Sequence, residues 1–268
     1  GMMKRLSNDA SCVFTGKGLS FGGSAMRPEA TGYGTVYFAQ EMLHREHLAF
    51  DGLRVSISGA GNVAQYAAEK AIELGARVVT LSDSEGTLVV DQGLQADQLG
   101  EIMEWKNVQR GRLSAFAERH GLQFEAGRRP WHVPVDVALP CATQNELDGD
   151  DARLLVRQGV RCVAEGANMP STLEAVNVFL DARTLYAPGK ASNAGGVATS
   201  GLEMTQNAMR LSWLHAEVDE RLHAIMKDIH MHCVRHGRRD DGSVNYVDGA
   251  NIAAFVKVAD AMLRQGVA

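Results

Sequence analysis

The sequence predicts an α/β fold, a Rossmann-like doubly wound and mostly parallel sheet followed by C-terminal helices. Between residues 54 and 187, short apolar and β-branched runs alternate with segments of helical period. That alternation is typical of parallel strands joined by helical crossovers. A glycine pattern, Gly59-x-Gly61-x-x-Ala64, lies between the first of these strands and the following helix. Rossmann-like folds carry such a turn at this point.

The predicted elements follow one another along the chain. A first helix runs from Pro28, which suits a first helical turn, to about residue 47. Strands are expected at 54–58, 77–81, 135–139, 160–164 and 185–187. Helices are expected at 62–74, 96–106, 113–120, 150–158 and 171–180, with Gly75 ending the first of these and Ser171 capping the last. From Asn193 no strand pattern returns, and three helices are expected at about 193–212, 215–236 and 249–265.

Composition and charge restrict the class of protein. The 268 residues are 45% hydrophobic and 22% charged, which are globular values for a chain that can bury a sizeable core. The net charge of −5 gives no electrostatic reason to expect nucleic acid or an anionic membrane as a partner. There is no run of eighteen apolar residues and no signal peptide, and the 4 cysteines form no CxxC pair. We therefore expect a cytoplasmic protein with no membrane span and no zinc site.

The glycine turn has a direct physical interpretation. Gly59 permits a tight strand-to-helix turn, Gly61 leaves room for a pyrophosphate, and Ala64 lets the helix pack closely on the strand. The helix N-terminus offers free N–H groups and a positive dipole to phosphates. Small residues in a tight turn could also serve packing alone. The preceding strand, the following helix and Asp83 at the end of the next strand favour dinucleotide binding.

The residues after the second strand leave the choice of cofactor open. A carboxylate such as Asp83 usually accepts the adenosine ribose hydroxyls, which favours NAD, and it repels a 2′-phosphate. Ser84 follows it, and Lys106, Arg110 and Arg112 lie downstream. These cations could neutralise a phosphate, or they could form an ordinary solvated helix face. Spacing alone leaves NAD and NADP equally open.

Six motifs resemble the signature of glutamate dehydrogenases. They occur in family order over nearly the whole chain: Arg27-Pro28-Glu29-Ala30-Thr31-Gly32-Tyr33-Gly34, Gly59 to Gln65, Cys141-Ala142-Thr143-Gln144-Asn145-Glu146, Glu165-Gly166-Ala167-Asn168-Met169-Pro170, Pro188 to Val197, and Ser200-Gly201-Leu202-Glu203-Met204. The chain looks most similar to the bacterial NADP-using hexamers, which carry a similar Asp-Ser pair and a downstream lysine. The resemblance implies NADP rather than NAD, with L-glutamate, 2-oxoglutarate and ammonium as substrates.

The resemblance also implies a role for individual residues. Gly59, Gly61, Asn62, Val63 and Ala64 match the turn under the cofactor, and Asn62 and Thr31 match residues at the nicotinamide ribose and carboxamide. Ala142 and Asn168 match the cofactor cleft, and Asp83, Ser84 and Lys106 match the 2′-phosphate pocket. On the substrate side, Arg27 matches a position near the nicotinamide, and Asn193, Val197 and Ser200 match positions facing the amino acid.

Most of these residues also have a purely structural alternative. Thr31 and Asn62 could cap helices, and Asn168 could be a turn residue. Ser200 could bond the preceding helical turn. Four histidines, His223, His230, His232 and His236, lie in one predicted helix. His232 and His236 could ligate a metal, but with no recognisable third ligand we interpret them as part of a polar or partly buried face.

The family's catalytic lysines and aspartate belong to an N-terminal domain, and we find no counterpart here. We assign no catalytic role to Gly16-Lys17-Gly18. We therefore expect an interdomain segment at 1–25, a dinucleotide-binding domain at 26–192, and helices at 193–268 that pack on it and toward the absent domain. The chain is expected to bind cofactor without turnover, and its parent to be a homohexamer.

Two other functions remain open. One is a branched-chain or aromatic amino-acid dehydrogenase of the same superfamily. Ser200 argues against it, because a hydroxyl there suits a substrate carboxylate better than an apolar side chain. The other is a non-catalytic dinucleotide-binding module, against which the substrate-side motifs argue.

Overall fold

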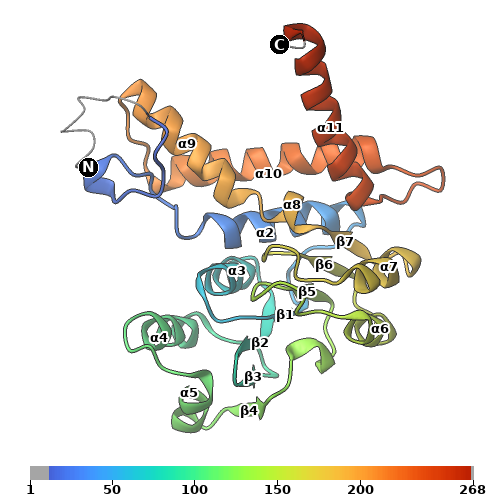
Figure 1. Cartoon of the computed structure of the whole chain (residues 1–268). Coiled ribbons are helices and arrows are strands. Elements are labelled where there is room, and N and C mark those ends of the chain that lie inside the picture. The colour runs from blue at the N-terminus through green and yellow to red at the C-terminus, as the bar shows by residue number, and fades with distance from the viewer. Residues whose placement is uncertain (1–11, 267–268) are drawn as a thin grey trace.

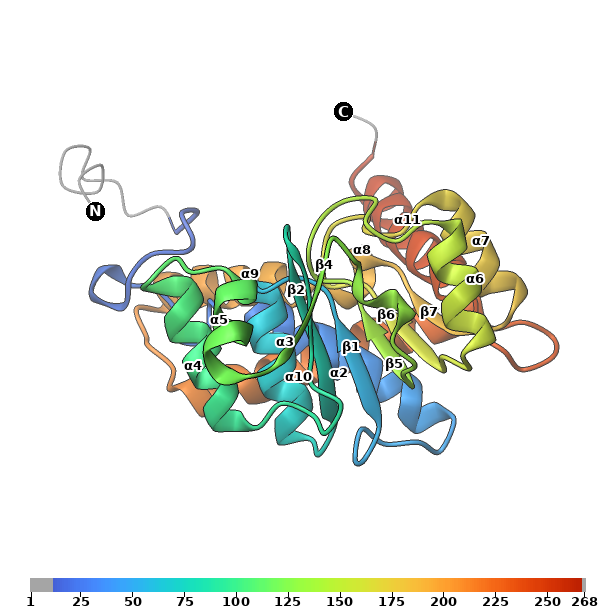
Figure 2. The same cartoon turned by 90° about the horizontal axis from the view of Figure 1, so that it is seen from below.

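A seven-stranded sheet forms the centre of the molecule, with helices on both of its faces (Figures 1 and 2). The computed structural model describes residues 12–266. The strand order is β4-β3-β2-β1-β5-β6-β7. The strands are β1 (Arg54–Ile57), β2 (Arg77–Asp83), β3 (Gly86–Val89), β4 (Gln123–Ala126), β5 (Val137–Leu139), β6 (Cys162–Ala164) and β7 (Leu185–Ala187). The predicted α/β class with a mostly parallel sheet is confirmed.

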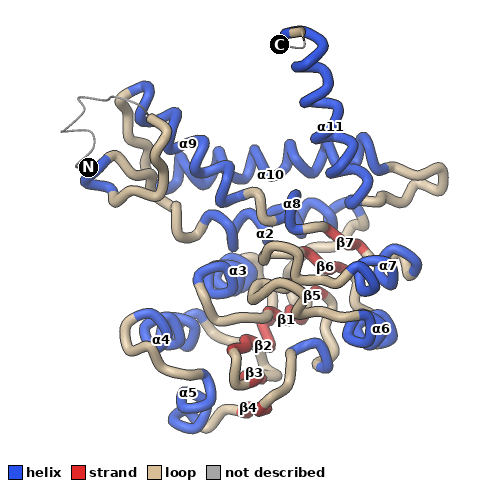
Figure 3. The backbone as a smooth tube through the Cα atoms, in the orientation of Figure 1, coloured by secondary structure: helices blue, strands red, loops and turns tan. Residues whose placement is uncertain are grey.

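Helices cover the sheet as two layers. The helices are α2 (Ala30–Arg45), α3 (Asn62–Glu73), α4 (Ala96–Asn107), α5 (Leu113–His120), α6 (Gly149–Arg157), α7 (Leu173–Asp181), α8 (Gly189–Ser192), α9 (Gly195–Met209), α10 (His215–Gly237) and α11 (Tyr246–Gln265), with short 3₁₀ turns η1 (Leu19–Phe21) and η2 (Pro130–His132). Helices α3, α4 and α5 lie on one side of the sheet, and α6 and α7 lie on the other (Figure 1). Within the described residues, the chain after β7 contains helices and loops and no further strand (Figure 3).

The two faces of the sheet bury two separate cores, because successive side chains of a strand point to opposite faces. Val78 of β2 and Val137 of β5 belong to the larger core, which α2, α3, α10 and part of α11 complete. Their neighbours Val79 and Ala138 belong to the smaller core beneath α6 and α7. Burial on both faces explains why these strands appear in the sequence as continuous apolar runs.

Five strands, β2-β1-β5-β6-β7, are parallel, so their carboxyl ends lie at one edge of the sheet. The chain leaves β1 toward β2 on one side and later returns to β5 on the other. Strands β1 and β5 therefore enclose the topological switch point. In open α/β sheets ligands bind in the crevice at this point.

The sequence did not predict β3 and β4, which extend the sheet in antiparallel register beyond β2. The chain reverses sharply between Asp83 and Gly86. Gly86 has a φ of 152°, and a Cβ there would lie 2.2 Å from the Glu125 carbonyl oxygen. Strand β4 is an edge strand with two exposed and two half-buried residues. An edge strand depends on pairing with its neighbour, so its own sequence lacks the apolar pattern of a buried strand.

Several predicted boundaries were wrong by a few residues. Helix α2 begins at Ala30 rather than at Pro28. The cap of α7 is Thr172, whose side chain accepts the Ala175 N–H, and not Ser171. The helix expected at 193–212 is the shorter α9, and α8, a short helix that was not expected, precedes it and is separated from it by a break. The break falls at Asn193, whose side chain donates to the Ala167 carbonyl and to Asn168.

The C-terminal helices share the larger core with the sheet. Val218, Leu222 and Met226 of α10 and Tyr246 of α11 are fully buried. The domain boundaries expected at 25 and 192 stay a prediction, and residues 1–11 of the expected interdomain segment lie outside the described residues. Over residues 12–266, no helix has both the length and the apolarity that a membrane crossing requires.

Candidate functional site

The glycine turn joins β1 to α3 at the switch point. Gly59 has a φ of 85°, and a Cβ there would come within 3.2 Å of the Ala142 Cα in the loop after β5. Gly61 is the N-cap of α3, and a Cβ there would meet nothing within 4 Å. Ala64 is completely buried. The N-terminus of α3 therefore has open space above it, which is the arrangement that phosphate binding requires.

A pocket of about 530 Å³ lies beside this turn. It brings together seven residues that the sequence singled out, namely Arg27, Thr31, Val63, Ala142, Asn168, Asn193 and Val197. Its other lining residues were not assigned from the sequence: Cys141, Gln144, Gly166, Ala167 and Gly196. Each of these residues belongs to a motif already recognised in the sequence, and that membership could have indicated that they line the pocket.

Two predicted residues, Ser200 and Asn62, hydrogen-bond to backbone carbonyls and do not line this pocket. The Ser200 hydroxyl donates to the Gly196 carbonyl at 3.1 Å, which is the structural alternative considered for it. The Asn62 side-chain amide donates to the Pro28 carbonyl, and the N-cap of α3 is Gly61 rather than Asn62. Asn62 thus links the start of α3 to the segment before α2.

A buried glutamate fixes the two loops that carry Asn168 and Asn193. Glu165 is 3% exposed. It accepts hydrogen bonds from the Ser171 amide at 3.2 Å, the Tyr186 hydroxyl at 2.6 Å and the Gly189 amide at 2.7 Å. The Asn193 side-chain amide then donates to Asn168 Oδ1 at 2.8 Å. Glu165 stands in a motif recognised in the sequence but was assigned no role there, although a glutamate directly after a buried strand is an unusual feature.

A second polar cluster lies at the end of β2. The Asp83 carboxylate accepts the Lys106 ammonium at 3.2 Å, the Leu113 amide at 2.9 Å and the Glu85 amide at 3.0 Å. Arg112 donates to the Ser84 hydroxyl at 2.8 Å. Burial by itself would raise the pKa of Asp83, but the bonds from these two amides and from Lys106 outweigh it and lower the pKa. The carboxylate is therefore ionised, and its three donors all come from this chain.

Other chemically active side chains have ordinary structural partners. Burial, followed by the charge of Glu146, raises the pKa of Cys141, which leaves a neutral thiol in the pocket wall. Lys17 bonds the buried Glu203 of α9 at 2.6 Å. On α10, His230 is buried against Tyr246 while His232 is exposed. Within residues 12–266 there is no group of three or more His, Cys, Asp or Glu side chains that could hold a metal ion.

Comparison with known proteins decides the family. A family model described as glutamate/leucine/phenylalanine/valine dehydrogenase matches residues 22–266. The chain belongs to this family. The NADP-specific glutamate dehydrogenase of Salmonella typhimurium is 63% identical to it over 267 residues, which is 100% of the chain and 60% of that protein. The predicted resemblance to glutamate dehydrogenases is thus confirmed.

Solved structures of glutamate dehydrogenases share the fold. The crystal structure of the Plasmodium falciparum enzyme superposes with a TM-score of 0.95 at 40% identity, covering 99% of this chain and 57% of that one. The chain therefore spans about 60% of the length of the family members it matches. The relatives are named for different cofactors. One from Bacteroides fragilis, 53% identical to this chain, is named an NAD-specific glutamate dehydrogenase.

Proposed function

We propose that this chain is the cofactor-binding part of an NADP-dependent glutamate dehydrogenase. The reaction of the whole protein would interconvert L-glutamate with 2-oxoglutarate and ammonium, with a hydride moving to or from the nicotinamide. The observation that carries the choice of NADP is the state of the Asp83 carboxylate. Its side chain is 8% exposed and already accepts hydrogen bonds from three donors of this chain.

A carboxylate used in this way is poorly placed to accept ribose hydroxyls. Asp83 instead holds Lys106 and the start of α5 beside the Asp83–Ser84 turn. Arg112 reaches the same turn through Ser84. A 2′-phosphate there would receive charge-assisted hydrogen bonds from two cations, and such bonds are the strong ones.

The rest of the cofactor fits the geometry of the switch point. The open N-terminus of α3 at Gly61 suits the pyrophosphate. The nicotinamide would then enter the 530 Å³ pocket, between Thr31 of α2 and the loops carrying Ala142 and Asn168. When bound, the cofactor supplies the hydride chemistry. The residues of this chain bind it, orient it and form one wall of the substrate cleft.

The substrate side of the pocket suits a carboxylate. Arg27 lines it, and its buried Nε has no hydrogen-bond partner. The positive charge of its guanidinium would attract an anionic group bound in the pocket. Asn193 and Val197 line the same region. Ser200 could donate to a carboxylate only after leaving the Gly196 carbonyl, which requires a change of its rotamer.

Calorimetric titration with NADPH and with NADH tests the proposal, on a sample shown to be folded by circular dichroism. We expect both to bind and NADPH to bind more tightly. No heat with either cofactor would remove the proposed function. Equal affinities would remove the preference for NADP and leave dinucleotide binding. We also propose that the whole protein is a homohexamer, which a measurement of the molecular mass of the full-length protein in solution would test.

A further inference from the structure

Glu146 belongs to the loop that follows β5. Its carboxylate accepts the Ser58 hydroxyl at 2.7 Å and the Ala142 amide at 3.0 Å through the same oxygen. The Ser58 hydroxyl oxygen in turn accepts the Cys141 amide at 2.9 Å. Ser58 is completely buried and directly precedes Gly59. One carboxylate oxygen thus ties the start of the β5 loop to the end of β1.

This loop forms one wall of the pocket and contacts both neighbouring loops. Cys141, Ala142 and Gln144 line the pocket. A Cβ on Gly59 would lie 3.2 Å from both the Cys141 carbonyl oxygen and the Ala142 Cα, so the loop rests against the glycine turn. On its other side, the Asn145 amide donates to the Met169 carbonyl at 3.0 Å in the loop after β6. A shift of the loop would change the width of the pocket.

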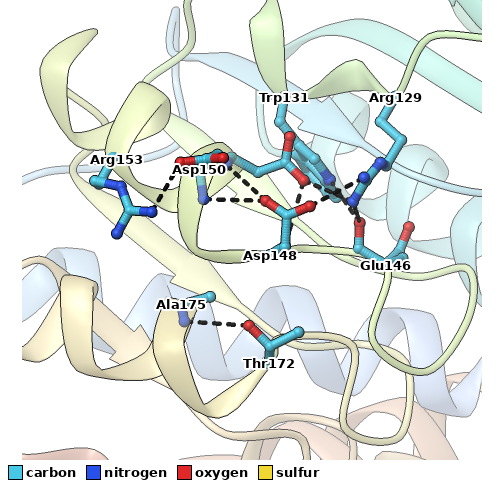
Figure 4. A network of polar contacts seen from close by, with 9 residues as sticks. Arg129, Trp131, Glu146, Asp148, Asp150, Arg153, Thr172 and Ala175 are labelled. Carbon is cyan, nitrogen blue, oxygen red and sulfur yellow. Dashed lines mark hydrogen bonds and ion pairs between the residues drawn. The ribbon is translucent and has the colours of Figure 1, made fainter.

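The backbone of Glu146 is held from outside the pocket. Arg129 donates to the Glu146 carbonyl at 2.6 Å and to the Asp148 carboxylate at 3.0 Å. Figure 4 shows Arg129 extending toward both residues, with Trp131 beside it. These bonds from Arg129 hold the main chain at Glu146. They therefore also restrict the direction in which the Glu146 side chain extends toward Ser58.

The Glu146 carboxylate is partly buried, so holding the loop with it carries a desolvation cost. Burial raises the pKa of Glu146, although the bonds from Ser58 and from the Ala142 and Thr143 amides oppose that rise. The same carboxylate oxygen is shared by a β1 side chain and a β5-loop amide. The position of this oxygen therefore links the end of β1 to the conformation of the loop after β5.

We propose that Glu146 is a positioning residue for the nicotinamide half of the cofactor. Through Ser58 and Ala142 it holds the loop from Cys141 to Gln144 against the Gly59 turn, at the width that the nicotinamide needs. The proposal rests on the proposed function, because it requires a dinucleotide in this pocket. The adenosine half would bind at Ser84 and Lys106, away from this loop, so the two halves respond differently to a change at Glu146.

The test compares two probes by calorimetry, NADPH and 2′,5′-ADP, which carries only the phosphorylated adenosine half. Glu146→Ala should weaken NADPH about tenfold and leave 2′,5′-ADP unchanged. Glu146→Gln keeps an acceptor oxygen for Ser58 and Ala142, so it should restore NADPH affinity to within about threefold of wild type. Ser58→Ala removes the same link from the other side and should reproduce the selective loss. It serves as the test if Glu146→Ala does not fold.

Glu174→Ala is the matched control, because Glu174 is an exposed carboxylate on α7 whose partner is Arg153. It should change neither affinity. Wild-type affinity for NADPH in Glu146→Ala and Ser58→Ala, or equal losses for both probes, would overturn the proposal while the proposed function stands. A wild-type chain that binds neither probe would remove the proposed function and this proposal together.

Discussion

At the scale of the residue, Lys106 is expected to distinguish the two cofactors. Its ammonium bonds Asp83 in the free chain and lies beside the turn proposed for the 2′-phosphate. Lys106→Ala should cost about 1–3 kcal/mol of binding free energy with NADPH and much less with NADH. Titration of both cofactors measures this, with exposed Lys227→Ala as control. Equal losses would show that Lys106 does not contact the phosphate.

A second residue, His230, should make stability depend on pH. Burial, followed by the charge of Arg45, lowers its pKa from 6.5 to about 4. The unfolded chain therefore takes up a proton near pH 6.5 and the folded chain only near pH 4. The contribution of His230 to the free energy of unfolding is fully present above pH 6.5. It is lost as the pH falls toward 4, by about 3 kcal/mol in total.

Urea unfolding between neutral and acid pH measures this dependence. His230→Leu should flatten the acid loss relative to wild type. His232→Leu, two residues along the same helix and 54% exposed, should retain the wild-type slope. A His230→Leu slope equal to that of wild type would show that other groups cause the loss.

At the scale of the element, the crossing of α2 and α3 depends on Gly32. A Cβ there would lie 2.5 Å from the Ala67 amide nitrogen and 2.7 Å from the Val63 carbonyl oxygen, both in the backbone of α3. Gly32→Ala must therefore separate the two helices, and it should lower the free energy of unfolding by about 1–3 kcal/mol. Because Val63 lines the pocket, NADPH affinity should fall too.

Gly100→Ala is the matched comparison for this element. Gly100 lies within α4, and a Cβ there would meet nothing within 4 Å. The change should raise the free energy of unfolding by about 0.5–1 kcal/mol, because alanine is the better helix former. Urea denaturation of both variants decides the matter. Equal stability of the two would mean that α2 and α3 can adjust more easily than their spacing indicates.

At the scale of the whole molecule, we expect cofactor binding without turnover. The described residues contribute Arg27 to the pocket lining but no lysine and no carboxylate. Holding the substrate against the nicotinamide can contribute about 7–11 kcal/mol, and proton transfer typically adds about 10²- to 10⁴-fold. A steady-state assay of NADPH with 2-oxoglutarate and ammonium measures turnover.

A rate near that of a complete glutamate dehydrogenase, assayed beside this chain, would contradict the prediction. Lys17 would then be the first residue to examine, because it is a lysine in a glycine-rich segment and it bonds Glu203 of α9. Adding an N-terminal domain of a relative in trans should partly restore activity if the cleft lacks only its other wall.

The sequence by itself determined the parallel part of the sheet and the glycine turn. These features have local causes: apolar runs with burial on both faces, helical period, and residues without side chains where the backbone must turn. Seven residues of the pocket lining were also assigned from the sequence, through the resemblance of their motifs to a known family.

Only the tertiary structure decided the features whose partners are distant along the chain. Strand β4 forms because β3 offers it an edge, and its half-exposed residues carry no strand pattern of their own. The role of Asp83 stayed open in the sequence because the Leu113 amide that occupies it is 30 residues away. Glu146 likewise bonds Ser58 across 88 residues. A hydrogen bond of this kind depends on how the chain folds back, which no local pattern specifies.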